Sequence, residues 1–148
     1  MIVLAIVVAI IIIIILSKYN SFVRLRNKVN QARSGIDVYL NQRFDLIPNL
    51  VVCVKAYTKH EKETIENITK MRSNYINSSK KDLEQAKEIN NGINKLIAVA
   101  ENYPELKSSE QYLNLQKNLT KMESQLQAAR RIYNMEVTNY NTKIKVNL

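Results

Sequence analysis

The chain's one histidine and one cysteine are the residues best suited to chemistry. His60 and Glu61 begin like the zinc-protease motif H-E-x-x-H, but Thr64 occupies the position of the second histidine. A zinc site with two histidines from one protomer is therefore excluded. Cys53 lies seven positions before His60, on one helix face but about 10 Å along the axis. A nucleophile and its base need roughly 3 Å, so we interpret Cys53 as a small core residue.

Charged residues offer a second kind of site. The simpler interpretation is that they form ion pairs between helices and fix the helix register: Asp37, Arg43, Asp45, Arg72, Arg130, Arg131 and Glu136. Exposed pairs contribute only about 0 to 1 kcal/mol each, so stability alone explains exposed ones poorly. The functional alternative is an interaction patch made of Arg43, Asp45, Pro48, Asn49, Tyr103 and Pro104. We predict no catalytic residues, no metal site and no cofactor, and hence a protein that is not an enzyme.

The first sixteen residues decide where such a patch would operate. Residues 1–16 carry no charge, proline or glycine, and Ser17 and Lys18 end the run. As a helix the run would be roughly 24 Å long, slightly less than the hydrocarbon core of a bilayer. A cleaved signal peptide would need a basic start and a small-residue exit, and a buried core helix would need a larger body around it. We predict a transmembrane anchor at 1–17, followed by one domain at 18–148.

Basic residues after the anchor indicate its orientation. Five of them precede the first acid, Asp37: Lys18, Arg24, Arg26, Lys28 and Arg33. By the positive-inside rule the N-terminus lies outside and the body is cytoplasmic. We expect Lys18, Tyr19, Arg24 and Arg26 to flank the membrane. The net charge of +9 then reflects topology and attraction to anionic lipid, because no basic stripe interleaved with aromatics predicts nucleic-acid binding.

Composition favours an all-α protein. Two glycines and two prolines are too few for the turns of a sheet protein, and a lone cysteine fits a reducing compartment. Apolar residues at spacings of three and four predict helices at about 22–43, 49–76, 83–100 and 112–144. We expect Ser34-Gly35 to mark a close helix crossing, and Ser79 with Asp82 and Ser108 with Gln111 to form capping boxes. Four amphipathic helices predict an antiparallel up-down-up-down bundle, with the loops holding Pro48 and Pro104 at its membrane-distal tip.

Several blocks of residues resemble the LemA family of bacterial membrane-anchored proteins. They are Tyr19-Asn20, Arg26-Asn27, Ile36-Asp37-Val38, Arg43-Phe44-Asp45-Leu46-Ile47-Pro48-Asn49-Leu50-Val51, Val54-Lys55-Ala56-Tyr57, His60-Glu61, Glu101-Asn102-Tyr103-Pro104-Glu105-Leu106-Lys107, Leu115-Gln116, Ala129-Arg130-Arg131, Tyr133-Asn134 and Tyr140-Asn141. The resemblance implies a short N-terminal membrane segment and an antiparallel helical bundle. It implies no settled activity, although some relatives are tied to bacterial membrane compartments. Two departures are Ala56, where the family usually has glycine, and the end of the chain at 144–148, where we expect a further segment.

Three functional hypotheses remain at this point. The leading one is a membrane-anchored, non-catalytic adaptor or scaffold with a cytoplasmic bundle. An exported or outward-facing bundle that binds or senses the cell envelope is the alternative, and a hydrolase is a remote one. The expected partners are the lipid bilayer and another protein, without nucleic acid, and a homo-oligomer is compatible with the sequence.

Overall fold

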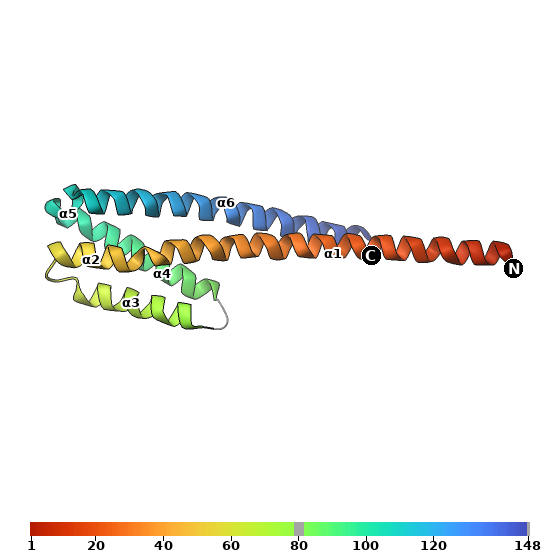
Figure 1. Cartoon of the computed structure of the whole chain (residues 1–148), viewed down its shortest axis with the longest axis horizontal. Coiled ribbons are helices and arrows are strands. Elements are labelled where there is room, and N and C mark those ends of the chain that lie inside the picture. Colours follow the sequence, from red (N-terminus) through yellow and green to blue (C-terminus); the bar gives the residue numbers. More distant parts are fainter. Residues whose placement is uncertain (79–81, 148) are drawn as a thin grey trace. The chain divides into compact units, whose positions relative to one another are not determined.

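The computed structural model describes residues 1–78 and 82–147, which are helical apart from short connections and include no strand. The helices are α1 (Ile2–Asp45), α2 (Ile47–Tyr57), α3 (Lys62–Asn77), α4 (Leu83–Val99), the 3-10 turn η1 (Ala100–Asn102), α5 (Pro104–Ser108) and α6 (Glu110–Asn147) (Figure 1). The prediction of an all-α protein with long helices is confirmed. The scarcity of glycine and proline explains it, because few positions can interrupt a helix.

The chain divides into two compact units, and α1 and α6 contribute to both. The anchor unit comprises Met1–Asp37 and Gln127–Leu148, and the core unit comprises Val38–Leu126. In the core unit, α3 runs back from the end of α2, and α4 then returns in the opposite direction (Figure 1).

Fully buried apolar side chains from every helix of the core unit form its interior. Burying one such side chain contributes about 1.5 to 3 kcal/mol. The ring of Phe44 on α1 meets the ring of Tyr75 on α3 edge to face, with centroids 5.1 Å apart. The largest of the other side chains are Leu40, Ile47, Leu50, Ile68, Ile89, Ile93, Leu96, Leu106, Tyr112 and Leu119.

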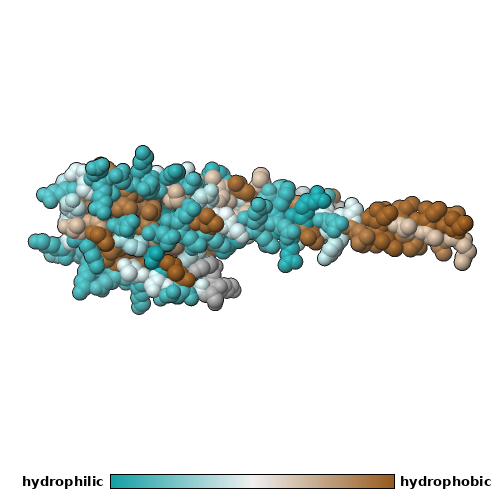
Figure 2. Space-filling view, viewed as in Figure 1, coloured by the Kyte–Doolittle hydropathy of each residue, from teal (hydrophilic) through white to brown (hydrophobic). Residues whose placement is uncertain are grey.

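The anchor unit begins with an apolar stretch that the protein leaves uncovered. An 18-residue window near the N-terminus has a mean hydropathy of 3.0, and none of it is buried. Figure 2 shows this stretch as a continuous brown surface. The helix is long and apolar enough to cross a membrane, which suggests a membrane anchor. Further along α1 and α6, half-buried residues recur at helical spacing, including Leu25, Val29, Tyr133 and Tyr140.

The helix predicted at 49–76 is wrong, because the structure divides it into α2 and α3. The break spans Thr58–Glu61, where Thr58 is extended (φ −120°, ψ 143°) and its N–H closes the helix on the Val54 carbonyl. The buried face of α2 stops at Val54 and resumes only at Ile65. A continuous helix would place Thr58 and Glu61 on that buried face, where polar groups are costly unless they are hydrogen-bonded. The chain reverses direction instead.

Other boundaries differ in detail from those that the sequence predicts. Pro104 begins α5 as well as ending the preceding turn. The predicted cap at Ser108 is wrong, since the adjacent Ser109 Oγ accepts the N–H of Tyr112 at 3.2 Å. Ser79 lies outside the described residues, and Asp82 caps α4 by accepting the N–H of Glu84 at 3.0 Å.

Two helices approach closely at Gly92 and not at Gly35. A close helix crossing at Gly35 is wrong, because no described atom outside its own helix lies within 4 Å of the place a Cβ would occupy. Gly92, by contrast, lies where α3 packs closely on α4. A Cβ there would stand 3.2 Å from the side chain of Ile68, so Gly92 allows the two helices to approach.

Candidate functional site

A buried arginine lies at the centre of the polar interactions in the core unit. Arg43, near the end of α1, is only 3% exposed. Its Nη1 donates to Asn90 Oδ1 at 2.8 Å, and its Nη2 donates to Asn94 Oδ1 at 3.3 Å. The carboxylate of Glu123 on α6 pairs with the same guanidinium. Three helices are therefore tied together by one cation, whose planar fork of donors suits several acceptors at once.

A second arginine completes the end of α1. Pro48 has no N–H, so the Phe44 carbonyl four residues earlier lacks the donor that a continuing helix would supply. Arg72 Nε from α3 donates to that carbonyl at 2.7 Å, and its Nη2 reaches Asp45 Oδ1 at 3.2 Å. A cation at a helix C-terminus is also favoured by the helix dipole. Arg72 and Asp45 thus form an ion pair between helices, as the sequence predicts.

The structure does not bring all six residues of the predicted interaction patch together. Arg43 is inside the core, which corrects its assignment to an exposed patch. Asp45, Pro48 and Asn49 are exposed around the start of α2, and Pro104 is exposed at the start of α5. Helix α5 contacts α2 near the Tyr57 end of α2 (Figure 1), about 15 Å along the axis from Pro48. As interaction residues, the remaining five stay a prediction.

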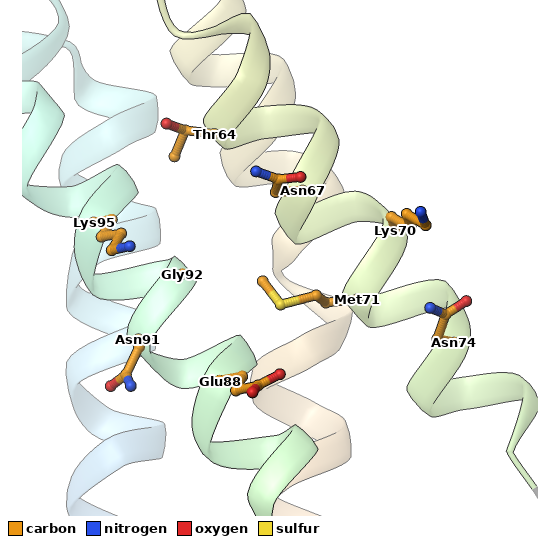
Figure 3. A pocket seen from close by; sticks show the side chains of 9 residues that line it. All are labelled: Thr64, Asn67, Lys70, Met71, Asn74, Glu88, Asn91, Gly92 and Lys95. Atoms are coloured by element: carbon orange, nitrogen blue, oxygen red, sulfur yellow. The ribbon is translucent and has the colours of Figure 1, made fainter.

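A polar groove between α3 and α4 is a site that the sequence did not predict. It has a volume of about 450 Å³, and Figure 3 shows side chains of both helices lining it. Its floor is apolar, formed by Met71 beside Gly92, and its walls carry amides, a hydroxyl, two ammonium groups and a carboxylate. The lining residues are Thr64, Asn67, Lys70, Met71, Asn74, Glu88, Asn91, Gly92 and Lys95. These groups can hydrogen-bond a polar ligand, but they include no nucleophile paired with a base.

Cys53 and His60 are separated by the break after α2. Cys53 is buried, with 2% of its surface exposed, whereas His60 is exposed in the connection that follows the helix. The prediction that they share one helix face is therefore wrong, and the reversal at Thr58–Glu61 is the reason. Among the described residues, no group of three or more His, Cys, Asp or Glu side chains is placed to hold a metal ion.

The core perturbs the pKa of Tyr112. The side chain lies at the start of α6, and its hydroxyl donates to the Ile97 carbonyl at 3.3 Å. Burial raises the pKa of this phenol above its ordinary value of 10.0, and electrostatic interaction with Glu101 and Cys53 acts in the same direction. The protonated phenol is therefore the form that the folded protein favours.

Comparison with known proteins identifies the family. The LemA family model matches residues 32–147, which include all of the core unit and part of the anchor unit. The chain belongs to the LemA family. It is 29% identical to Protein LemA of Metamycoplasma hominis over 84% of this chain and 58% of that protein. It is also 23% identical to Magnetosome protein MamQ 2 of Paramagnetospirillum magneticum and 22% identical to Magnetosome protein MamQ of Magnetospirillum gryphiswaldense.

Each alignment with the MamQ proteins covers 88% of this LemA-family chain, and the chain spans 58% of the length of all three relatives. The names of these relatives describe no catalytic activity. The block from Arg43 to Val51, which carries the resemblance to LemA proteins, is the junction between α1 and α2. Its arginine and its proline take part in the two structural contacts described above.

The sequence suggested only part of this polar framework. Asn90 falls on the apolar stripe of α4, and a polar residue in such a position signals a buried partner. Glu123 could not be identified in that way, because it lies beside the stripe of α6 and its side chain is 31% exposed.

Proposed function

We propose that this LemA-family chain is a membrane-anchored, non-catalytic adaptor or scaffold, held in the bilayer by one N-terminal helix with its body on the cytoplasmic side. The observation that carries the proposal is the uncovered apolar helix of residues 2–16, every one of which is exposed. Exposing so large an apolar surface to water is unfavourable, and no described part of the chain covers it. A lipid bilayer is the environment that suits it.

The proposed orientation rests on charge. Lys18, Arg24, Arg26, Lys28 and Arg33 follow the apolar stretch before any acid occurs, and basic residues beside a membrane segment are retained on the cytoplasmic side. The single-pass anchor thus has its N-terminus outside. The proposed body is a four-helix up-down-up-down bundle in which the end of α1 and α2 together act as the first member, followed by α3, α4 and α6.

An adaptor role fits the chemistry of the core unit. The buried Arg43 and Asn90 join helices to one another, and the groove between α3 and α4 offers binding groups without a catalytic pair. We propose that another protein docks around the start of α2 and the start of α5, at the exposed Asp45, Pro48, Asn49 and Pro104 and the half-buried Tyr103. The MamQ relatives, named as magnetosome proteins, make assembly at an internal membrane a reasonable setting.

Cysteine accessibility in intact cells tests the orientation. Cys53 is 2% exposed and would report poorly, so it is first replaced by alanine, and Lys59, exposed between α2 and α3, is replaced by cysteine. The Lys59→Cys variant should react with a membrane-impermeant maleimide only after permeabilisation. Labelling in intact cells would instead support the outward-facing, envelope-binding alternative.

Site-specific crosslinking tests the adaptor role. A photo-crosslinker at Asn49 should capture one defined protein, and a second Pro104→Ala substitution in the same chain should weaken that adduct. The same crosslinker at Asn67, in the groove on α3, is the matched control because Asn67 is also an exposed asparagine. Equal capture from both positions would reject the proposed docking surface.

A further inference from the structure

The polar groove of the core unit, about 450 Å³ in volume, lies between two rows of side chains, one on α3 and one on α4. Within each row the residues are three or four positions apart, which keeps them on one face of their helix. The two helices run in opposite directions, so the start of the α3 row lies beside the end of the α4 row (Figure 3). The residues that matter here are Thr64, Asn67 and Met71 on α3, and Glu88, Asn91 and Lys95 on α4.

The two ends of the α4 row carry opposite charges. Lys95 and Glu88 are seven positions apart, so they lie on one face of α4 and about 10 Å apart along its axis. The hydroxyl of Thr64 belongs to the Lys95 end. The other lysine of the groove, Lys70, lies on the side of α3 that faces away from α4 (Figure 3). The groove is therefore dipolar, with a cation at one end and a carboxylate at the other.

The polar side chains of the groove have no partners within the described residues 1–78 and 82–147. Elsewhere on the same helices, exposed side chains pair along their own helix, as in Lys62 with Glu66, Asn77 with Ser73, and Lys87 with Glu84. Glu88 and Lys95 have no opposite charge three or four positions away on α4, where such a pair would form. Their charges remain available to a ligand.

This lining excludes several classes of ligand. The described residues that line the groove include no aromatic ring, on which a nucleobase would stack. A free phosphate would be repelled by Glu88, and a polyamine by Lys95. A ligand that carries one charge of each sign suits both ends. Between the ends, the amides of Asn67 and Asn91 each offer a donor and an acceptor, which match the N–H and C=O of a peptide group.

We propose that the groove between α3 and α4 binds a short zwitterionic peptide of about three residues. Three extended residues span at most about 10 to 11 Å, which matches the separation of Lys95 and Glu88 along α4. The terminal carboxylate of the peptide lies against Lys95 and the Thr64 hydroxyl, and its terminal ammonium group lies against Glu88. The flexible thioether of Met71 forms the floor, on which a central apolar side chain packs.

This site goes beyond the proposed function, because it uses none of the residues assigned to the membrane anchor or to protein docking. The test is a titration of the full, nitrogen-15-labelled chain in neutral detergent with the peptide Ala-Leu-Ala, followed by nuclear magnetic resonance. The side-chain amide signals of Asn67 and Asn91 report binding at the groove itself. We expect saturable shifts of both signals with a dissociation constant of about 0.1 to 1 mM, as for a small ligand in an open site.

Two further ligands test whether both peptide termini are recognised. The same peptide with an acetylated N-terminus and an amidated C-terminus should bind at least about tenfold more weakly, because it loses both charged contacts. Free glycine carries both charges but is too short to reach both ends, so it should also bind at least about tenfold more weakly. Equal affinity for either ligand, or no saturable shift with Ala-Leu-Ala, would overturn the proposal.

Substitutions on α4 test the two ends of the groove. E88Q and K95Q should each weaken binding of Ala-Leu-Ala about three- to fivefold. The matched controls, E84Q and K87Q, remove the same charges from an exposed pair outside the groove and should leave the affinity unchanged. All four side chains are exposed, so the variants keep the fold. Equal losses in the controls would show a general effect of charge and overturn the proposal.

Exchanging the two charges tests the direction of binding. In the double variant E88K/K95E the groove keeps one charge of each sign, so the peptide can bind in the opposite direction. We expect its affinity to lie within about threefold of the wild-type value, because an exposed charge contact contributes little and is replaced at each end. If the double variant bound Ala-Leu-Ala no better than E88Q, the assignment of the two ends would be wrong and the proposal would fail.

Discussion

Replacing Glu123 by alanine should destabilise the core unit far more than removing an exposed carboxylate. The side chain of Arg43 is 4% exposed, and its guanidinium pairs with Glu123. Arginine stays charged at any ordinary pH, so the substitution leaves a buried cation facing the amide oxygens of Asn90 and Asn94. Breaking a buried pair on one side costs about 3 to 5 kcal/mol. Because Glu123 is 31% exposed and water can enter, we expect about 2 to 3 kcal/mol.

The matched control is Glu66→Ala on α3. Glu66 pairs with Lys62 at 3.8 Å, and both side chains are largely exposed, so its loss should cost less than about 1 kcal/mol. Both variants are unfolded in urea with the chain held in detergent micelles, and far-ultraviolet circular dichroism follows the core unit. If the free energy of unfolding falls with urea concentration at an unchanged slope, the shift in the unfolding midpoint reports a change in stability.

A double substitution distinguishes charge burial from lost packing. Replacing the pair by apolar residues of similar size, as in R43M/E123L, removes the cation together with its partner and is often close to neutral. We therefore expect the double variant to be more stable than Glu123→Ala alone. If Glu123→Ala unfolded at the same urea concentration as Glu66→Ala, the reasoning about the buried cation would be refuted.

Four further substitutions test other contacts by the same unfolding assay. Arg72→Met removes the donor to the Phe44 carbonyl and should cost about 1 to 3 kcal/mol; an unchanged midpoint would mean that water replaces the donor. Gly35→Ala should raise stability by up to about 1 kcal/mol, since the site is open, whereas Gly92→Ala should lower it by about 1 to 3 kcal/mol through crowding against α3. Burial raises the pKa of Tyr112, and the phenol of the unfolded chain therefore ionises first as the pH rises. The contribution of Tyr112 to the free energy of unfolding is complete below pH 10 and is lost at higher pH. Tyr112→Phe should reduce this alkaline loss of stability, and an unchanged dependence of stability on pH above 10 would contradict the reasoning.

Local patterns in the sequence predicted the elements of this fold better than their connections. The apolar run at 1–16 and the helical spacing of α4 and α6 depend on neighbours three and four positions away, which sequence inspection can see. The reversal at Thr58–Glu61 carries neither proline nor glycine. It was missed because the only local signal is a gap in the buried face between Val54 and Ile65.

The features that could not be predicted from the sequence depend on contacts between residues far apart in the chain. Gly35 and Gly92 look equivalent as glycines within helical patterns, and only the approach of Ile68 distinguishes them. Arg43 was assigned to an exposed patch because a charged residue near a helix end is usually solvated. Its partners, Asn90 and Glu123, lie 47 and 80 positions away, and the residues next to Arg43 in the sequence do not predict them.

The contacts of Pro48 and Arg43 have a consequence for the order in which this protein is made. Arg72, which donates to the Phe44 carbonyl, lies 28 positions after Phe44. At a synthesis rate of about 5 to 20 residues per second, Arg72 leaves the ribosome roughly 1 to 6 seconds after Phe44. Glu123, 80 positions beyond Arg43, follows after roughly 4 to 16 seconds. The apolar N-terminal helix has long since emerged by then. Membrane targeting can therefore act on a nascent chain in which Arg43 is still hydrated and the Phe44 carbonyl at the end of α1 still lacks its donor.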